Sequence, residues 1–299
     1  MNGYFCVLTT IDFFVLCFMC ILTYLSETLS KKQKRGFFLA FVLIAGISVL
    51  EVITLVVDGL PPGYRWLNIT ANYLGFGLSP AVCICLVYVL DRKTALRREI
   101  RTAVRIEIGY LIFLFVTIPC GMVFSVSADN IYSRGPHFYI YVVMYFGAIL
   151  YLSASTVITA RAFQNRSSPP IYPLTLFVIA ATTIQLPLPE LHLTSVPVTL
   201  LSVLYFIYCS EMWNQLDALT GLLNQNSYLK QTGGVRCKGG VLVVFDVDDF
   251  KQINDRYGHI QGDRCLAGIA ECIKKSYANF GYCYRIGGDE FCVLLKNGG

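Results

Sequence analysis

Two acidic clusters in the C-terminal third of the sequence could do chemistry. Residues 246–249 read Asp-Val-Asp-Asp and follow the apolar run 241–245, while residues 287–290 read Gly-Gly-Asp-Glu. Carboxylates presented at a strand end and on a glycine turn suit Mg²⁺, a hard cation that takes few protein ligands and binds substrate phosphates. The pattern predicts nucleotidyl transfer, in which a metal polarises a phosphate and a hydroxyl attacks it in line.

Three further side chains could bind the rest of a nucleotide. Lys251 follows the first cluster by one helical turn and can neutralise phosphate charge. Asn254 and Asp263 can read a purine edge, because Asp accepts hydrogen bonds from guanine N–H groups and Asn both donates and accepts. Either acidic cluster alone would favour a plainer interpretation, a solvated turn beside a capped helix, so the chemistry depends on both together.

These residues must be positioned by a small α/β unit. The run 241–245 is continuously β-prone, which predicts a buried strand. Residues 282–286 and 291–295 predict two short strands, joined by a tight hairpin at 287–290 in which glycines supply positive φ.

Two helical segments are predicted around the first strand. Gly262-Asp263 is expected to open an amphipathic helix whose apolar face is Leu266, Ile269, Ala270 and Ile273. Upstream, residues 214–224 indicate a short linker and a helix start, with Asp217 as the N-cap and an apolar face formed by Leu219, Leu222 and Leu223.

Taken in order, these blocks resemble the GGDEF family, the diguanylate cyclases. The matching stretches are Asp217–Leu222, Phe245–Asp255, Tyr257–His259, Gly262-Asp263 and Arg285–Phe291. They cover about 80 of the 299 residues and say nothing about the rest of the chain. The resemblance implies a palm-like α/β domain with a central antiparallel sheet flanked by helices. It also implies an enzyme that joins two GTP molecules into cyclic di-GMP and works as a homodimer, each domain holding one GTP.

The resemblance implies catalytic and metal-binding residues. Asp246, the carbonyl of Val247 and Asp289 would hold Mg²⁺ or Mn²⁺. Glu290 would lie beside the attacking 3′-hydroxyl and either bind metal or remove the proton, so Asp289 and Glu290 are the expected catalytic pair.

The resemblance also implies substrate-binding and supporting residues. Phe250 and Lys251 occupy positions that contact the triphosphate in the family, and Asn254 and Asp263 occupy positions that contact the guanine. Gly287 and Gly288 would leave room for the nucleotide. Arg285 resembles a structural arginine that orients the turn, and His259 is expected to support the loop before Gly262 without catalysing.

The sequence departs from the family pattern in three places. Asn224-Gln225 replaces the usual Asn-Arg, and Ala278 and Gly281 stand where the family has the Arg-x-x-Asp of a product-inhibition site, so no such feedback site is expected. The family's domain continues for roughly as long again after Gly299. The sequence is therefore expected to be either a fragment of a longer protein, which the ending Lys296–Gly299 favours because it gives no natural helix or strand stop, or a truncated product with little activity.

The composition of the remaining chain points to a membrane. Hydrophobic residues make up 55% of the sequence and charged residues 14%, with a mean hydropathy of +0.58. A soluble domain carries about 25% charged residues, so an ordinary soluble protein and a disordered one are both excluded. The net charge of +5 includes no basic tail, so no nucleic-acid partner is expected.

Seven apolar stretches approach the ~20 residues needed to cross the bilayer as a helix. They are 4–25, 36–58, 70–90, 106–125, 138–160, 171–188 and 196–213, the sixth being the weakest because prolines crowd it. Twelve Lys and Arg residues lie in the loops 26–35, 91–105 and 161–170, against only Arg65 and Arg134 in the alternate loops. The positive-inside rule then places the N-terminus outside and residue 214 in the cytoplasm.

Three acids fall within or at the edge of these stretches. Asp12, Glu51 and Glu107 are candidates for a functional site because charge in hydrocarbon is costly, and the alternative is an interhelical hydrogen bond without a ligand. For Glu107, beside the basic loop, the hydrogen bond is favoured, whereas for Glu51 the two interpretations are even. The twelve cysteines show no zinc pattern and favour reduced thiols.

The sequence therefore predicts three parts: a seven-helix transmembrane sensor region at 1–213, a linker at 214–217 and a partial GGDEF domain at 218–299. The leading hypothesis is a diguanylate cyclase in the inner cell membrane, regulated by the helical sensor. The alternatives are a non-catalytic membrane receptor whose degenerate domain binds GTP or dimerises and, with less support, a transporter, since the spans show no internal repeat.

Overall fold

The computed structural model describes residues 3–90, 96–164, 171–185, 195–233 and 241–295. The chain divides into two compact units, the first holding Met1–Ile158 and Pro169–Cys209 and the second Thr159–Ser168 and Ser210–Gly299. Helices α5 (Tyr139–Ala162) and α7 (Ser195–Asn214) therefore each end in the second unit.

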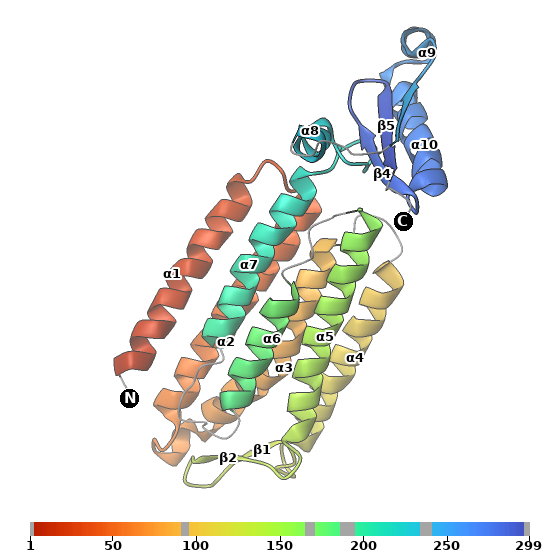
Figure 1. Ribbon diagram of the computed structural model, residues 1–299. Helices are drawn as coiled ribbons and strands as arrows, with labels where there is room; N and C mark the ends of the chain where they lie inside the picture. Colours follow the sequence, from red (N-terminus) through yellow and green to blue (C-terminus); the bar gives the residue numbers. More distant parts are fainter. Residues whose placement is uncertain (1–2, 91–95, 165–170, 186–194, 234–240, 296–299) are drawn as a thin grey trace. The chain divides into compact units, whose positions relative to one another are not determined.

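Within the described residues, seven helices run alongside one another in the N-terminal part of the chain (Figure 1). Besides α5 and α7 they are α1 (Gly3–Leu25), α2 (Lys31–Val57), α3 (Arg65–Leu90), α4 (Leu96–Thr117) and α6 (Ile171–Gln185), with a short 3₁₀ turn η1 (Pro62–Tyr64) before α3. Helix α2 packs against α1 and α3, and α3 packs against α4. A capping box between Ser30 and Gln33 starts α2, because each side chain bonds the other residue's backbone N–H.

Five described segments are long and apolar enough to cross a membrane, which indicates a multi-pass membrane protein. They are Val7–Leu25, Lys31–Val57, Pro62–Leu90, Tyr139–Ala162 and Val196–Asn214. The two other predicted spans do not qualify. Helix α4 carries four arginines in its first ten residues, and the described part of α6 has only 15 residues. At 1.5 Å per residue α6 reaches about 22 Å, short of the ~30 Å hydrocarbon core.

The predicted fourth span was also wrong in its bounds. Helix α4 begins at Leu96, inside the stretch assigned to a loop, and ends at Thr117. The rest of the stretch leads into a hairpin of β1 (Phe124–Val126) and β2 (Tyr132–Arg134). Buried Asn130 in the hairpin turn donates to the carbonyls of Val57 (2.7 Å) and Leu60 (3.1 Å). Asn130 lies outside the predicted span 106–125, whose last two residues, Phe124 and Ser125, belong to β1 and not to a membrane helix.

The three intrahelical acids lie in α1, α2 and α4. Asp12 and Glu107 are buried, with 5% and 6% of their surfaces exposed, and Glu51 is partly buried. Glu107, expected at the edge of a span, lies near the middle of α4 and is buried. Ligand binding by any of the three stays a hypothesis.

The second unit contains a three-stranded antiparallel sheet covered on one face by a helix. Its elements are α8 (Gln225–Gly233), β3 (Leu242–Asp246), α9 (Phe250–Tyr257), α10 (His259–Tyr277), β4 (Gly281–Arg285) and β5 (Glu290–Leu295), with strand order β3-β5-β4. Helix α10 runs beside the sheet (Figure 1). The core joins α10 to the sheet through Leu222, Leu266, Ala270, Ile273, Cys283, Phe291 and Val293.

The expected amphipathic helix and the two expected hairpin strands are confirmed, the strands within one residue. The helix begins at His259 and not at Gly262, because Gly258, at φ +81°, ends α9 and caps α10 directly. The strand predicted at 241–245 is confirmed as β3 within one residue, but its predicted burial on both faces was wrong. Val243 and Phe245 pack against the core, but Leu242 and Val244, on the opposite face, are 44% and 58% exposed because α10 covers only one side of the sheet.

Candidate active site

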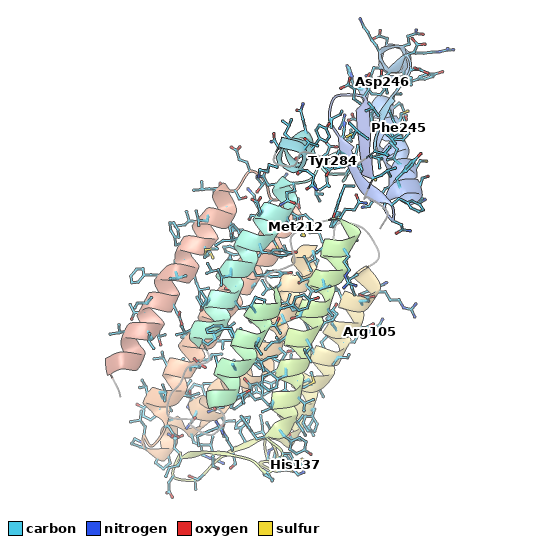
Figure 2. All side chains as sticks on the ribbon, viewed as in Figure 1. Arg105, His137, Met212, Phe245, Asp246 and Tyr284 are labelled. Carbon is cyan, nitrogen blue, oxygen red and sulfur yellow. The ribbon has the colours of Figure 1, made fainter. Side chains whose placement is uncertain are left out.

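The two acidic clusters meet at one end of the sheet. Strands β3 and β5 pair antiparallel, and the register sets Asp246 directly opposite Glu290. Side chains of directly opposed residues lie on the same face, with Cβ atoms about 4.5–5.5 Å apart. Figure 2 marks Phe245 and Asp246 on β3. The pairing therefore gathers carboxylates that are 44 positions apart in the sequence.

The chain turns sharply after Asp246. The N–H of Val247 donates to Asp246 Oδ1 (3.1 Å), and the carbonyl of Val247 accepts from the N–H of Phe250 (3.3 Å). Asp249 has a left-handed φ of 53° at the start of α9. A carbonyl oxygen has two lone pairs, so that of Val247 keeps acceptor capacity toward a cation.

The turn between β4 and β5 brings Glu290 back over Gly287. The carbonyl of Glu290 accepts from the N–H groups of Ile286 (3.0 Å) and Gly287 (3.4 Å). A Cβ added to Gly287 would stand 2.6 Å from Glu290 Oε2, whereas one added to Gly288 would meet nothing within 4 Å. Neither glycine has positive φ, which corrects that expectation. Gly287 accommodates the close approach of the Glu290 side chain, which any larger residue would displace.

Arg285 holds the turn from the other side. Its guanidinium donates through Nε (3.2 Å) and Nη2 (2.6 Å) to the carbonyl of Gly288, and through Nη1 (3.1 Å) to Asp217 Oδ1. These bonds agree with the role implied for Arg285, since a planar fork fixes direction as well as distance.

Asp217 is not a helix N-cap, and this expectation was wrong. Its Oδ1 accepts from the N–H (2.8 Å) and hydroxyl (2.6 Å) of Thr220 in a tight turn, and α8 begins only at Gln225. Gly221, at φ +69°, completes the turn. The sequence Asp-x-x-Thr before a glycine could have predicted this Asx-type turn. No local signal could have predicted that Asp217 pairs with Arg285, because the two residues are 68 positions apart.

The electrostatics of Asp217 follow from these contacts. Partial burial acts to raise the pKa of its carboxyl, but the hydrogen bonds from Thr220 and Arg285, together with the guanidinium charge, outweigh it. The net result is a pKa below the ordinary value, so Asp217 is held as the anion.

The expected guanine-binding residues lie at the junction of α9 and α10. A Cβ on Gly262 would collide with Asn254 Oδ1, so Asn254 lies against the residue preceding Asp263. Lys251 is exposed on α9, while Phe250 is partly buried and packs against the core. His259 is the first residue of α10 and is exposed.

The donor set can be tested against a divalent cation. Among the described residues, no cluster of three or more His, Cys, Asp or Glu side chains could hold a metal ion on its own. Mg²⁺ commonly takes one or two carboxylates and completes its shell with water and substrate phosphates. The opposed Asp246 and Glu290, with the Val247 carbonyl beside them, fit that requirement when a nucleotide supplies the remaining ligands.

Comparison with known proteins agrees with this geometry. Residues 214–298 match the family described as "Diguanylate cyclase, GGDEF domain". The probable diguanylate cyclase DgcI of Escherichia coli is 40% identical over 96 residues, covering 32% of this chain and 21% of the relative. Diguanylate cyclase DgcS of Shewanella oneidensis is 39% identical over 92 residues, covering 29% of this chain and 31% of the relative.

Similarity to solved structures is limited in extent. A diguanylate cyclase/phosphodiesterase structure from Caldicellulosiruptor saccharolyticus aligns with a TM-score of 0.27 and 27% identity over 30% of this chain and 57% of that chain. The chain matches only about a fifth of the length of DgcI and about a third of the length of DgcS.

Proposed function

Because residues 214–298 match the GGDEF family and follow five candidate membrane spans, we propose that this protein is a membrane-bound diguanylate cyclase. It joins two GTP molecules into cyclic di-GMP and releases two pyrophosphates. The observation that carries the proposal is the β3–β5 register, which sets Asp246 opposite Glu290. The plainer alternative, a solvated acidic turn, gives no reason for two carboxylates far apart in the sequence to lie at the same end of a sheet.

The acidic end of the sheet would hold the reacting groups. Asp246, the Val247 carbonyl and Asp289 bind the cation, and Glu290 lies where it can also bind it or accept the proton of the attacking 3′-hydroxyl. When bound, Mg²⁺ or Mn²⁺ polarises the phosphate under attack. The close approach of Glu290 Oε2 to Gly287 supports this assignment, since it means that the carboxylate lies over the turn.

The remaining residues would bind the nucleotide. Lys251 and the backbone at Phe250 face the triphosphate, and Asn254 and Asp263 bind the guanine edge. Gly287 and Gly288 leave room for the ligand, and the open space around Gly288 supports this role. Each domain then presents one GTP, so product formation requires a homodimer.

The membrane part would place this site in the cytoplasm of a bacterial cell. Basic residues flank alternate helices on one side, which favours an external N-terminus and a cytoplasmic C-terminal domain. The helical region acts as a sensor, and α7 passes the signal through residues 214–217. The carbonyls of Asn214 and Gln215 accept hydrogen bonds from Asn224 and Ser227, so this linker is tied to the domain. Insertions of one to four residues at 214–216 should alter output, and unchanged output across the series would contradict this coupling.

The decisive experiment measures GTP turnover by the chain in nanodiscs with Mg²⁺ and labelled GTP. Cyclic di-GMP is the expected product, and Glu290→Gln should lower its rate by about two to four orders of magnitude. Glu271→Gln, the same change on an exposed part of α10, is the matched control and should leave the rate unchanged. Saturable GTP binding without product would instead favour a receptor with a degenerate domain, and would contradict the cyclase assignment for this chain.

A further inference from the structure

The side chain of Gln164, just beyond the end of α5, pairs with the backbone around β4. Its Nε2 donates to the carbonyls of Gly281 (2.8 Å) and Ala278 (3.1 Å), and its Oε1 accepts from the N–H of Cys283 (3.0 Å). All of these residues belong to the second unit. The side-chain amide thus accepts from the N–H of Cys283 and donates to the carbonyl of Gly281, two residues earlier. The backbone of one residue in a neighbouring parallel β-strand would make the same two hydrogen bonds.

The contact completes the outer edge of the sheet. Strand β4 lies at the edge of the three-stranded sheet, so one side of its backbone has no partner strand. On that side, Leu223 pairs with the second half of β4: its N–H donates to the Cys283 carbonyl (3.1 Å), and its carbonyl accepts from the Arg285 N–H (2.8 Å). Gln164 and Leu223 together pair the outward backbone groups from Gly281 to Arg285. Without Gln164 the first half of that edge would present unpaired polar groups.

The position of Gln164 is itself constrained. Its backbone has a left-handed φ of 55°, which is uncommon outside glycine, and its N–H donates to the carbonyl of Arg161 (3.1 Å). Phe163, the preceding residue, packs edge-to-face against Trp213 of α7 with ring centroids 5.5 Å apart. The ammonium of Lys274 from α10 lies 5.2 Å from the Phe163 ring centroid. The end of α5 is therefore anchored at two adjacent side chains.

Strand β4 leads directly into the candidate catalytic turn. Arg285, its last residue, binds Gly288, and the next two N–H groups, of Ile286 and Gly287, donate to the carbonyl of Glu290. A displacement of β4 at Gly281–Cys283 is thus transmitted along one short strand to the turn that presents Asp289 and Glu290.

We propose that Gln164 is a positioning residue that couples the end of α5 to the catalytic turn through β4. The C-terminal domain then receives two connections from the helical region, one through the α7 linker and one through Gln164. The regulatory meaning of this coupling rests on the proposed cyclase function, but the coupling itself can be tested without activity.

The test is residue-resolved amide hydrogen exchange on the whole chain in nanodiscs. Gln164→Met keeps the length of the side chain and removes the three hydrogen bonds. It should raise exchange at Cys283 by about two- to tenfold, the range expected for one lost hydrogen bond, and also raise exchange at Ile286 and Gly287. The amide of Cys292, in the central strand, should change little. Gln225→Met, the same change at an exposed position of α8, is the control.

Two exchange results would overturn the proposal. Unchanged exchange at the Cys283 amide would mean that the contact is not formed. Faster exchange at Cys283 with unchanged exchange at Ile286 and Gly287 would mean that the contact does not position Glu290. GTP turnover provides an independent readout, in which Gln164→Met lowers kcat while KM for GTP stays within about twofold. A wild-type chain that makes no cyclic di-GMP would count against the proposed function, while the exchange data would still decide the coupling.

Discussion

Asp246 and Glu290 are direct partners in the antiparallel register of β3 and β5. Asp246 belongs to the cluster 246–249 and Glu290 to the cluster 287–290. Only strand pairing brings their carboxylates to one end of the sheet. Because like charges on directly opposed residues are destabilising, the proposed cation would stabilise this pair by binding both carboxylates.

The first prediction concerns this shared cation. Asp246→Asn and Glu290→Gln should each weaken Mn²⁺ binding in the presence of GTP, measured by electron paramagnetic resonance. Because both side chains would contact one ion, the double variant should show a coupling of about 0.5–3 kcal/mol in binding free energy. Asp255→Asn, on the exposed side of α9, should leave the affinity unchanged. Strictly additive effects would show that the two residues do not share an ion.

The two glycines of the turn should separate experimentally. Gly287→Ala places a Cβ against the Glu290 carboxylate, so this side chain must move even without ligand. The variant should therefore lose Mn²⁺ affinity as well as turnover. Gly288→Ala meets nothing within 4 Å and should weaken only GTP binding. Equal effects of both substitutions on Mn²⁺ affinity would refute the close-approach argument.

A second glycine pair tests the packing of the sheet. A Cβ at Gly281 would collide with the backbone carbonyl of Leu294 in the adjacent strand, so Gly281→Ala should destabilise the domain by about 1–3 kcal/mol. Gly268, within α10, has nothing within 4 Å, and Gly268→Ala should stabilise it by about 0.5–1 kcal/mol. Urea titration followed by pulse proteolysis measures both changes. A tolerated alanine at 281 would show that β4 and β5 are not packed this closely.

The depressed pKa of Asp217 makes the domain sensitive to acid. The folded-state pKa lies below the unfolded value of about 3.9. Its contribution to stability is therefore complete above about pH 4 and is lost as the pH falls through the folded-state pKa. Asp217→Asn should lower the urea midpoint at pH 7, and the difference from wild type should shrink below pH 4.

Arg285→Gln removes the same ion pair from the other side and should show the same narrowing with acid. A difference that persists unchanged to pH 3 for both variants would mean that the ion pair does not contribute to folding stability.

Local patterns sufficed for much of this fold. The length of continuous apolar stretches located α1, α2, α3, α5 and α7 within a few residues, because a membrane helix satisfies its own backbone and needs only length and apolarity. The hairpin of β4 and β5 was also predictable, since its strands are adjacent in the chain. Average hydropathy failed at α4, because it could not distinguish a basic amphipathic helix followed by a hairpin from a span.

The sequence alone therefore predicted membrane-spanning helices and two acidic motifs near the C-terminus, since residue type and local spacing carry that information. The fold added the relationships between distant residues: Asp246 opposite Glu290, Asp217 paired with Arg285, and Gln164 bound to β4. These contacts join residues 44 to 119 positions apart. Such contacts depend on strand register and on the direction in which helices end, and local propensity does not encode either.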